Sequence, residues 1–159
     1  MAADVPDPPD PPDPPGVPDA PLGPARWDLL PGRPWAGFAT GTHRLHLVHG
    51  DRCRTRAALF AEWAGSLAFP DYFGHNWDAF EECLHDTLHP PGAATATRLL
   101  VLVAAADALL ADDPPDQLAV LLAVLDAAAA TGPLRVQFTT TPPRADRTRH
   151  RLRTAARAM

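Results

Sequence analysis

The chain lacks several features on which large protein classes depend. Its 14 Lys and Arg residues are all arginine, so it has no lysine for the phosphate-binding loop of nucleotide-binding proteins. It has no G-x-G-x-x-G or G-x-S-x-G stretch, which excludes the usual signatures of dinucleotide binding and of the hydrolase nucleophile. Its two cysteines, Cys53 and Cys83, are too few for a scaffold built on disulfides.

The chain also lacks a basic excess and any long apolar segment. Its formal net charge is −5, whereas nucleic-acid-binding domains are usually strongly basic. The longest apolar run, Leu99–Ala106, is far too short to cross a bilayer. Asp and Pro occupy the N-terminal positions where a signal peptide has basic and then apolar residues. We therefore expect a soluble, cytoplasmic protein that binds neither nucleic acid nor membranes directly.

Residues 1–40 are predicted to be a disordered tail rich in Pro and Asp. Asp4, Asp7, Asp10 and Asp13 recur at every third residue, and polyproline II has three residues per turn. These carboxylates would line one edge of an extended rod, which leaves binding to a partner as the alternative interpretation.

Residues 143–159 form an Arg-rich C-terminal extension, in which six arginines stand against Asp146 alone. The pattern is compatible with a basic helix that frays. It also fits a disordered tail that binds nucleic acid or an acidic neighbour. A segment that folds back onto the acidic body of the protein is the third interpretation.

One domain is predicted between these tails, at residues 41–142. Residue patterns indicate the order strand, helix, helix, strand, helix, strand, at residues 43–49, 56–64, 76–88, 98–104, 115–130 and 134–140. Thr55 is the expected N-cap of the first helix, and Gly132 the C-terminal cap of the third. Because long helical crossovers join the strands, we expect an α/β fold with a small three-stranded parallel sheet covered by helices.

The helix predicted at residues 76–88 separates two kinds of side chain. Asn76 is its expected N-cap. Its apolar side chains recur at helical spacing and form a core stripe of Trp77, Phe80, Leu84 and Leu88. Cys83 lies beside that stripe and is interpreted as a small packed hydrophobe. The opposite side is polar and carries Asp78, Glu82 and His85, with Glu81 adjacent.

The acidic side of this helix works against stability. Asp78 and Glu82 point the same way from consecutive turns, and like charges at that spacing cost roughly 0.2–0.5 kcal/mol. No Lys or Arg occurs between Ala57 and Thr97 to neutralise them. An ordinary solvated acidic face is one interpretation. Tyr72 and Phe73 in the preceding loop, residues 69–75, favour a contact surface, because exposed aromatic residues beside paired carboxylates are typical of interface anchors.

The stretch Tyr72-Phe-Gly-His-Asn-Trp-Asp-Ala-Phe-Glu-Glu-Cys-Leu84 resembles the signature of barstar, the intracellular inhibitor of the ribonuclease barnase. The resemblance continues upstream through Val48-His-Gly50 and Leu67-Ala-Phe-Pro70, and downstream in element order to about Thr141. It implies a barstar-like fold. It also implies a protein that plugs the active site of a nuclease stoichiometrically, with carboxylates where the RNA phosphates would lie.

The same resemblance implies roles for single residues. Tyr72 would pack on a catalytic residue of the nuclease, while Asp78 would pair with a basic substrate-binding residue and Glu82 would fill the phosphate pocket. Gly74 and Asn76 would shape the loop. The full set expected to bind the partner is Tyr72, Phe73, Gly74, His75, Asn76, Asp78, Glu81, Glu82 and His85. The expected partner is a ribonuclease with a basic active site. We expect a monomer that is not an enzyme and that uses no cofactor or metal.

Three alternatives remain open. His85 and His89 stand four residues apart, with Glu82 and His75 nearby in sequence, as in a helical metal site, although helical geometry fails at His89 before two prolines. A nucleophile–base pair would need Cys83 and His85 to converge, but they point in different directions from the helix. The third alternative is a non-inhibitory acidic module that binds a basic protein partner.

Overall fold

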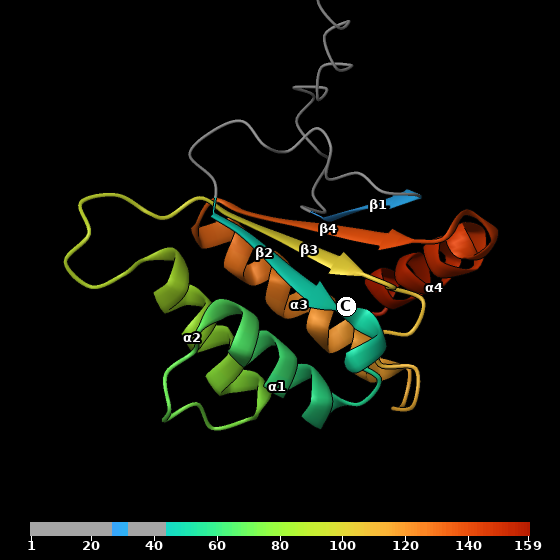
Figure 1. Ribbon diagram of the computed structural model, residues 1–159, viewed down its shortest axis with the longest axis horizontal. Coiled ribbons are helices and arrows are strands. Elements are labelled where there is room, and N and C mark those ends of the chain that lie inside the picture. Colours follow the sequence, from blue (N-terminus) through green and yellow to red (C-terminus); the bar gives the residue numbers. More distant parts are fainter. Residues whose placement is uncertain (1–26, 32–43) are drawn as a thin grey trace, which may run out of the picture.

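The computed structural model describes residues 27–31 and 44–159, which form a sheet with helices packed against it (Figure 1). The strands are β1 (Trp27–Pro31), β2 (Arg44–His49), β3 (Leu99–Ala104) and β4 (Leu134–Thr140). The α-helices are α1 (Arg56–Leu67), α2 (Trp77–Leu88), α3 (Asp116–Thr131) and α4 (Ala145–Arg157). Two short 3-10 helices, η2 (Gly50–Arg52) and η3 (Pro142–Arg144), follow β2 and β4.

The strands lie in the order β1-β4-β3-β2, and each neighbouring pair is parallel. The register aligns His46 with Val101 and Val101 with Val136 across the three strands that the sequence predicts. The crossovers between these strands are helical. The predicted α/β fold is therefore confirmed.

β1 is a further strand, which the residue pattern did not reveal. It pairs with β4 over Trp27–Pro31, inside the stretch interpreted as an N-terminal tail. The strand is short, and it ends in a proline, a residue that a sheet accepts at an edge because it has no N–H to donate. The tail interpretation otherwise falls on residues 1–26 and 32–40, which lie outside the described residues.

The hydrophobic core lies between the sheet and the helices. Val48, Val101 and Phe138 enter it from the strands, and Trp63 and Phe80 enter it from α1 and α2; all five are fully buried. Figure 1 shows α1, α2 and α3 on one side of the sheet, with α4 beyond α3 near β1 and β4. None of the helices in the described ranges is both long enough and apolar enough to span a membrane.

The start of α1 is determined by a local side-chain cap, and the end of α3 by its packing against α2. Thr55 caps α1 as predicted, because its Oγ1 accepts the N–H of Ala58 at 3.3 Å. Gly132 ends α3 with an extended φ of −153°, not in the left-handed conformation of most capping glycines. A Cβ at Gly132 would lie 3.0 Å from His89 Nε2 and 3.2 Å from Leu88 Cβ. Gly132 therefore serves the close approach of α3 to the end of α2.

The Arg-rich C-terminal segment folds back onto the domain as α4. Its buried residues are Ala145, Thr148, Leu152 and Ala155, which recur at helical spacing and face α3 and β1. The domain boundary predicted at residue 142 therefore precedes a helix that shares the core. The pattern was hard to recognise because Leu152 is the single large apolar side chain on the buried side of this helix.

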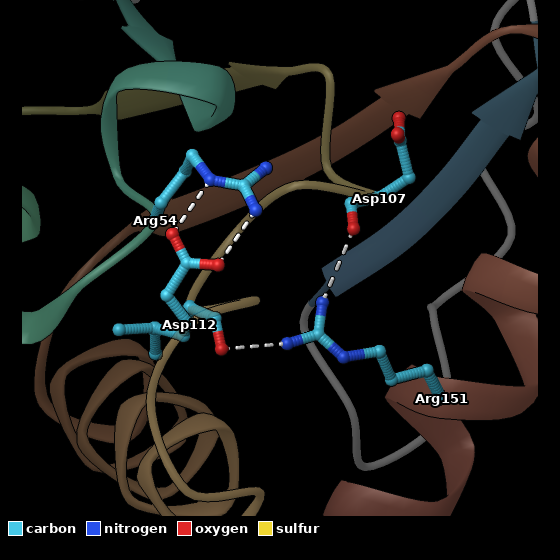
Figure 2. A network of polar contacts seen from close by, with 5 residues as sticks. Arg54, Asp107, Asp112 and Arg151 are labelled. Atoms are coloured by element: carbon cyan, nitrogen blue, oxygen red, sulfur yellow. Dashed lines mark hydrogen bonds and ion pairs between the residues drawn. The ribbon is translucent and has the colours of Figure 1, made fainter.

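α4 is tied to the loop that follows β3. Arg151 donates from its guanidinium to the backbone carbonyl oxygens of Leu110 at 3.0 Å and Asp107 at 3.4 Å (Figure 2). Elsewhere on the same loop, Arg54 donates two hydrogen bonds to the Asp112 carboxylate, at 2.7 and 2.6 Å. Figure 2 shows these contacts side by side, so the loop is held from α4 and from the segment just before α1 together.

We expect Leu152→Ala to lower the free energy of unfolding by about 2–5 kcal/mol, because it leaves a cavity in the core. Leu152 is 2% exposed. Arg153→Ala, at an exposed position of the same helix, should change stability by less than about 0.5 kcal/mol. Urea unfolding followed by circular dichroism measures both. Equally small losses in the two variants would show that α4 is not part of the cooperative unit.

Asp107 provides a pH-dependent test of the same contacts. Burial opposes ionisation of Asp107, but hydrogen bonds from Thr140 at 2.7 Å and Arg144 at 2.6 Å outweigh it and hold the pKa of this carboxyl below its usual value. A lowered folded-state pKa adds stability above the unfolded pKa of about 4, and this is lost as the pH falls through the folded value. We expect Asp107→Asn to be less stable than the wild type at neutral pH by on the order of 1 kcal/mol.

Thermal melts of both proteins across the acidic range check this expectation. The gap between them should close as the pH falls well below about 4. A gap that stays constant with pH would mean that the Asp107 charge contributes nothing to folding.

Candidate partner-binding surface

The loop from α1 to α2, residues 68–76, is anchored by a buried ring. Phe73 is 6% exposed, and its ring meets those of Phe69 and Phe60 edge to face, with centroids 5.2 and 5.8 Å away. Its N–H donates to the carbonyl of Pro70 at 2.9 Å, which closes a turn. The sequence predicts Phe73 to be an exposed contact residue, and this is wrong, because its ring belongs to the core. Phe73 holds the loop from the inside.

Tyr72 is the side chain that protrudes from this loop. It is 79% exposed, while its neighbour Phe73 is inserted into the core. A tyrosine held in this way presents a broad apolar ring and a hydroxyl to a partner. Aromatic side chains of this kind supply much of the binding energy at protein interfaces.

Asn76 joins the loop to α2. Its Oδ1 accepts the N–H of Ala79 at 2.9 Å, and its Nδ2 donates to the Gly74 carbonyl at 3.3 Å, so the predicted N-cap is confirmed. A Cβ at Gly74 would lie 3.2 Å from that Nδ2, so glycine leaves room for the cap. His75 lies between them with a φ of +52°, in the left-handed region, and its ring stacks on Phe73 with centroids 4.7 Å apart.

The outer side of α2 is acidic. The exposed residues there include Asp78, Glu81, Glu82 and His85. The buried residues on the other side are Phe80, Cys83, Leu84 and Leu88, as predicted. Trp77, also predicted for this stripe, is half-buried and packs against the core. Among the described residues, no arginine forms an ion pair with Asp78, Glu81 or Glu82. These carboxylates are thus available to cationic groups on another molecule.

A hollow of about 270 Å³ lies next to the loop, lined by Thr55, Arg56, Ala57, Phe60, His75 and Asp113. The backbone N–H of Arg56 donates to the Asp113 carboxylate. Arg56 Nη1 and Trp77 Nε1 both donate to Gln117 Oε1, at 3.5 and 3.0 Å. The starts of α1, α2 and α3 are therefore linked by side-chain hydrogen bonds. Local patterns could not reveal this, because Gln117 lies 40 residues from Trp77 along the chain.

The model of a known protein family matches the part of the chain that contains this candidate surface. The model, described as Barstar (barnase inhibitor), matches residues 43–141, which include the loop and α2. The chain belongs to the barstar family. Proteins of the barstar family are inhibitors and not enzymes. Because the family description names the ribonuclease barnase, membership implies a ribonuclease as the general class of partner.

The comparison with solved structures concerns the fold alone. The crystal structure of Cdc6p from Pyrobaculum aerophilum is similar over 79% of this chain and 36% of its own, with a TM-score of 0.53 and 18% sequence identity. The chain therefore spans little more than a third of the length of that protein. A search among curated protein sequences finds no match.

The histidines considered as metal ligands have other contacts in this barstar-family domain. The ring of His85 on α2 and that of His89, the residue that follows α2, have centroids 4.7 Å apart. Nε2 of His89 is 3.0 Å from the Thr131 carbonyl oxygen. Within residues 27–31 and 44–159, no group of three or more His, Cys, Asp and Glu side chains is placed to hold a metal ion.

Both cysteines are expected to be inert thiols. Burial raises the pKa of Cys53 to about 12, with a further contribution from Glu62 and Asp51, and burial also raises the pKa of Cys83. Because the thiolate is the reactive form, neither should react with Ellman's reagent at about pH 8 before unfolding, and both should react after it. Rapid labelling of Cys83 in the folded protein would contradict this and would favour a reactive role for that residue.

Proposed function

We propose that the chain is a stoichiometric inhibitor of a ribonuclease, of the immunity or antitoxin type. It would plug the nuclease active site with the Tyr72 loop and the acidic side of α2. The observation that supports this most directly is the surface itself: a 79% exposed tyrosine beside carboxylates that no described arginine neutralises. The surface lies within the segment that matches the barstar family.

The chemistry of the proposed target explains why two carboxylates are needed on the same side of α2. Asp78 and Glu82 project from consecutive turns of α2, so they can enter one basic cavity together. A ribonuclease must hold RNA phosphates with cationic groups, and carboxylates form strong, charge-assisted hydrogen bonds with the same groups. Opposite charges also accelerate the encounter of the two proteins at low salt.

The remaining residues act around this pair. Glu81 and His85 extend the polar contact along α2, while Gly74, His75 and Asn76 fix the path of the loop that presents Tyr72. We propose that Tyr72 packs against the catalytic centre of the nuclease and that Phe73 supports it from the core. The inhibitor would act as a monomer in the cytoplasm, where it would protect the cell from a nuclease toxin.

The second candidate is an acidic module that binds a basic protein without inhibiting an enzyme. This module would use the same surface, but its binding would not block the activity of an enzyme. Titration against purified barnase and against small ribonucleases encoded in the same genome separates the two. The inhibitor should abolish RNA cleavage by its target at a one-to-one ratio. If none of these enzymes is inhibited, the non-inhibitory acidic module is favoured.

The mechanism is tested by Glu82→Gln and Asp78→Asn. Against the ribonuclease that the titration identifies, each change should cost about 2–5 kcal/mol of binding, mostly as faster dissociation, because cationic groups of the nuclease would be left buried and unpaired. Thermal melts should show an intact fold, with Glu82→Gln neutral or more stable by a few tenths of a kcal/mol because a like-charge repulsion is relieved.

Asp146→Asn is the matched control, since it removes one exposed carboxylate from α4 and should leave the dissociation rate unchanged. Wild-type affinity in both α2 variants would rule out phosphate mimicry, even if inhibition itself were observed.

A further inference from the structure

The side chain of Gln117 joins the first turns of three helices. Gln117 is the second residue of α3, and its Oε1 accepts hydrogen bonds from Trp77 Nε1 at 3.0 Å and from Arg56 Nη1 at 3.5 Å. Trp77 is the first residue of α2, and Arg56 is the first residue of α1. The shorter of the two bonds therefore connects α3 to the end of α2 that follows the Tyr72 loop.

The amide group of Gln117 fits its neighbours in one orientation only. Its Nε2 donates to the Asp116 carboxylate at 3.0 Å, and an ionised carboxylate can only accept a hydrogen bond. The indole of Trp77 and the guanidinium of Arg56 can only donate. An exchange of the amide oxygen and nitrogen would thus lose all three contacts. The neighbours of Gln117 consequently require an acceptor that points toward α2.

The ring of Trp77 is held by packing as well as by this hydrogen bond. It meets the rings of Phe60 and Phe80 edge to face, with centroids 5.0 and 5.9 Å away. Such aromatic contacts determine where the ring lies, and the bond to Gln117 determines which edge of the indole faces α3. The first residue of α2 is therefore held in one orientation from both sides.

Trp77 stands between a residue that shapes the loop and a residue of the acidic side. Asn76 before it caps α2 and binds the Gly74 carbonyl, and Asp78 after it is the first carboxylate of the helix. Side chains lie about 5–6 Å from the axis of a helix, so a rotation of α2 by about 10° would displace Asp78 by about 1 Å. Binding groups need to be held within about 0.5 Å, so the rotation of α2 matters for binding.

We propose that Gln117 is a positioning residue of the proposed partner-binding surface. Through Trp77 it sets the rotation of α2 about its own axis, and with it the direction of Asp78. The effect on a nuclease rests on the proposed function, whereas the orientation of α2 is a property of the free protein. A bond that only stabilises the fold is the competing interpretation, and the experiments below separate the two.

The first experiment uses the free protein and needs no nuclease. Gln117→Met keeps the length of the side chain and removes the acceptor, so the indole N–H signal of Trp77 should shift in a ¹H–¹⁵N spectrum and exchange faster with water. The amide signals of Asp78 and Ala79 should shift with it. Gln117→Glu keeps an acceptor oxygen and should leave these amide signals close to their wild-type positions. A shift confined to the indole would overturn the proposal, because Trp77 would then not carry α2 with it.

The second experiment measures dissociation from the ribonuclease that the titration identifies. Gln117→Met should dissociate about 3- to 10-fold faster, as expected for the loss of one hydrogen bond. Trp77→Phe, which removes the donor, should behave in the same way, whereas Gln117→Glu should dissociate like the wild type. Thr148→Val is the matched control. It removes a hydrogen bond from the Thr148 hydroxyl to the Arg144 carbonyl oxygen, which belongs to α4 and not to α2, and should leave dissociation unchanged.

A double-mutant cycle separates positioning from simple stabilisation. If Gln117 acts by directing Asp78, most of the effect of Gln117→Met on dissociation should vanish in the Asp78→Asn background, because coupled residues are not additive. An undiminished effect in that background would overturn the positioning role. If the titration finds no inhibited ribonuclease, it is the proposed function that fails, and the spectra of the free protein still decide whether Gln117 orients α2.

Discussion

The proposed partner-binding surface depends on the burial of Phe60. The rings of Phe73, Trp77 and Phe80 all lie against it, at centroid distances of 5.8, 5.0 and 5.8 Å. These three residues belong to the loop and to the first turns of α2, so one side chain of α1 sets the position of both. Because Phe73 is inserted here, Tyr72 is turned to solvent, and because Phe80 is inserted here, Asp78 and Glu82 face outward. The exposed surface is a consequence of how the aromatic core is filled.

α3 lies between the acidic helix α2 and the arginine-rich helix α4. The acidic side of α2 lies to one side of this helix, and the arginines of α4 lie to the other. The net charge of −5 therefore describes neither surface. Fields of opposite sign attract different partners, and screening limits their influence to about 10 Å at moderate salt.

Elements with a strong local pattern were predictable from the sequence, and elements completed by distant contacts were not. The apolar run of β3 and the Asn76 cap of α2 follow from local rules, and both are observed. β1 has too few residues for a pattern and exists because β4 offers it an open edge. α4 reads as a basic tail, since small residues and one leucine form most of its buried side. Phe73 could not be distinguished from Tyr72 by spacing, because the identity of the buried ring depends on the position of Phe60.

The distribution of ion pairs supports the proposal that the acidic side of α2 binds a partner. In the described part of the chain, every ion pair between an arginine and a carboxylate lies outside α2: Arg52–Glu62, Arg54–Asp112, Arg144–Asp107 and Arg149–Asp146. A surface under no functional constraint would gain from a similar arginine one turn away from Asp78 or Glu82. No arginine occurs there, and the like-charge cost remains. Local sacrifices of this kind are typical of binding surfaces, where the compensating charge comes from the partner.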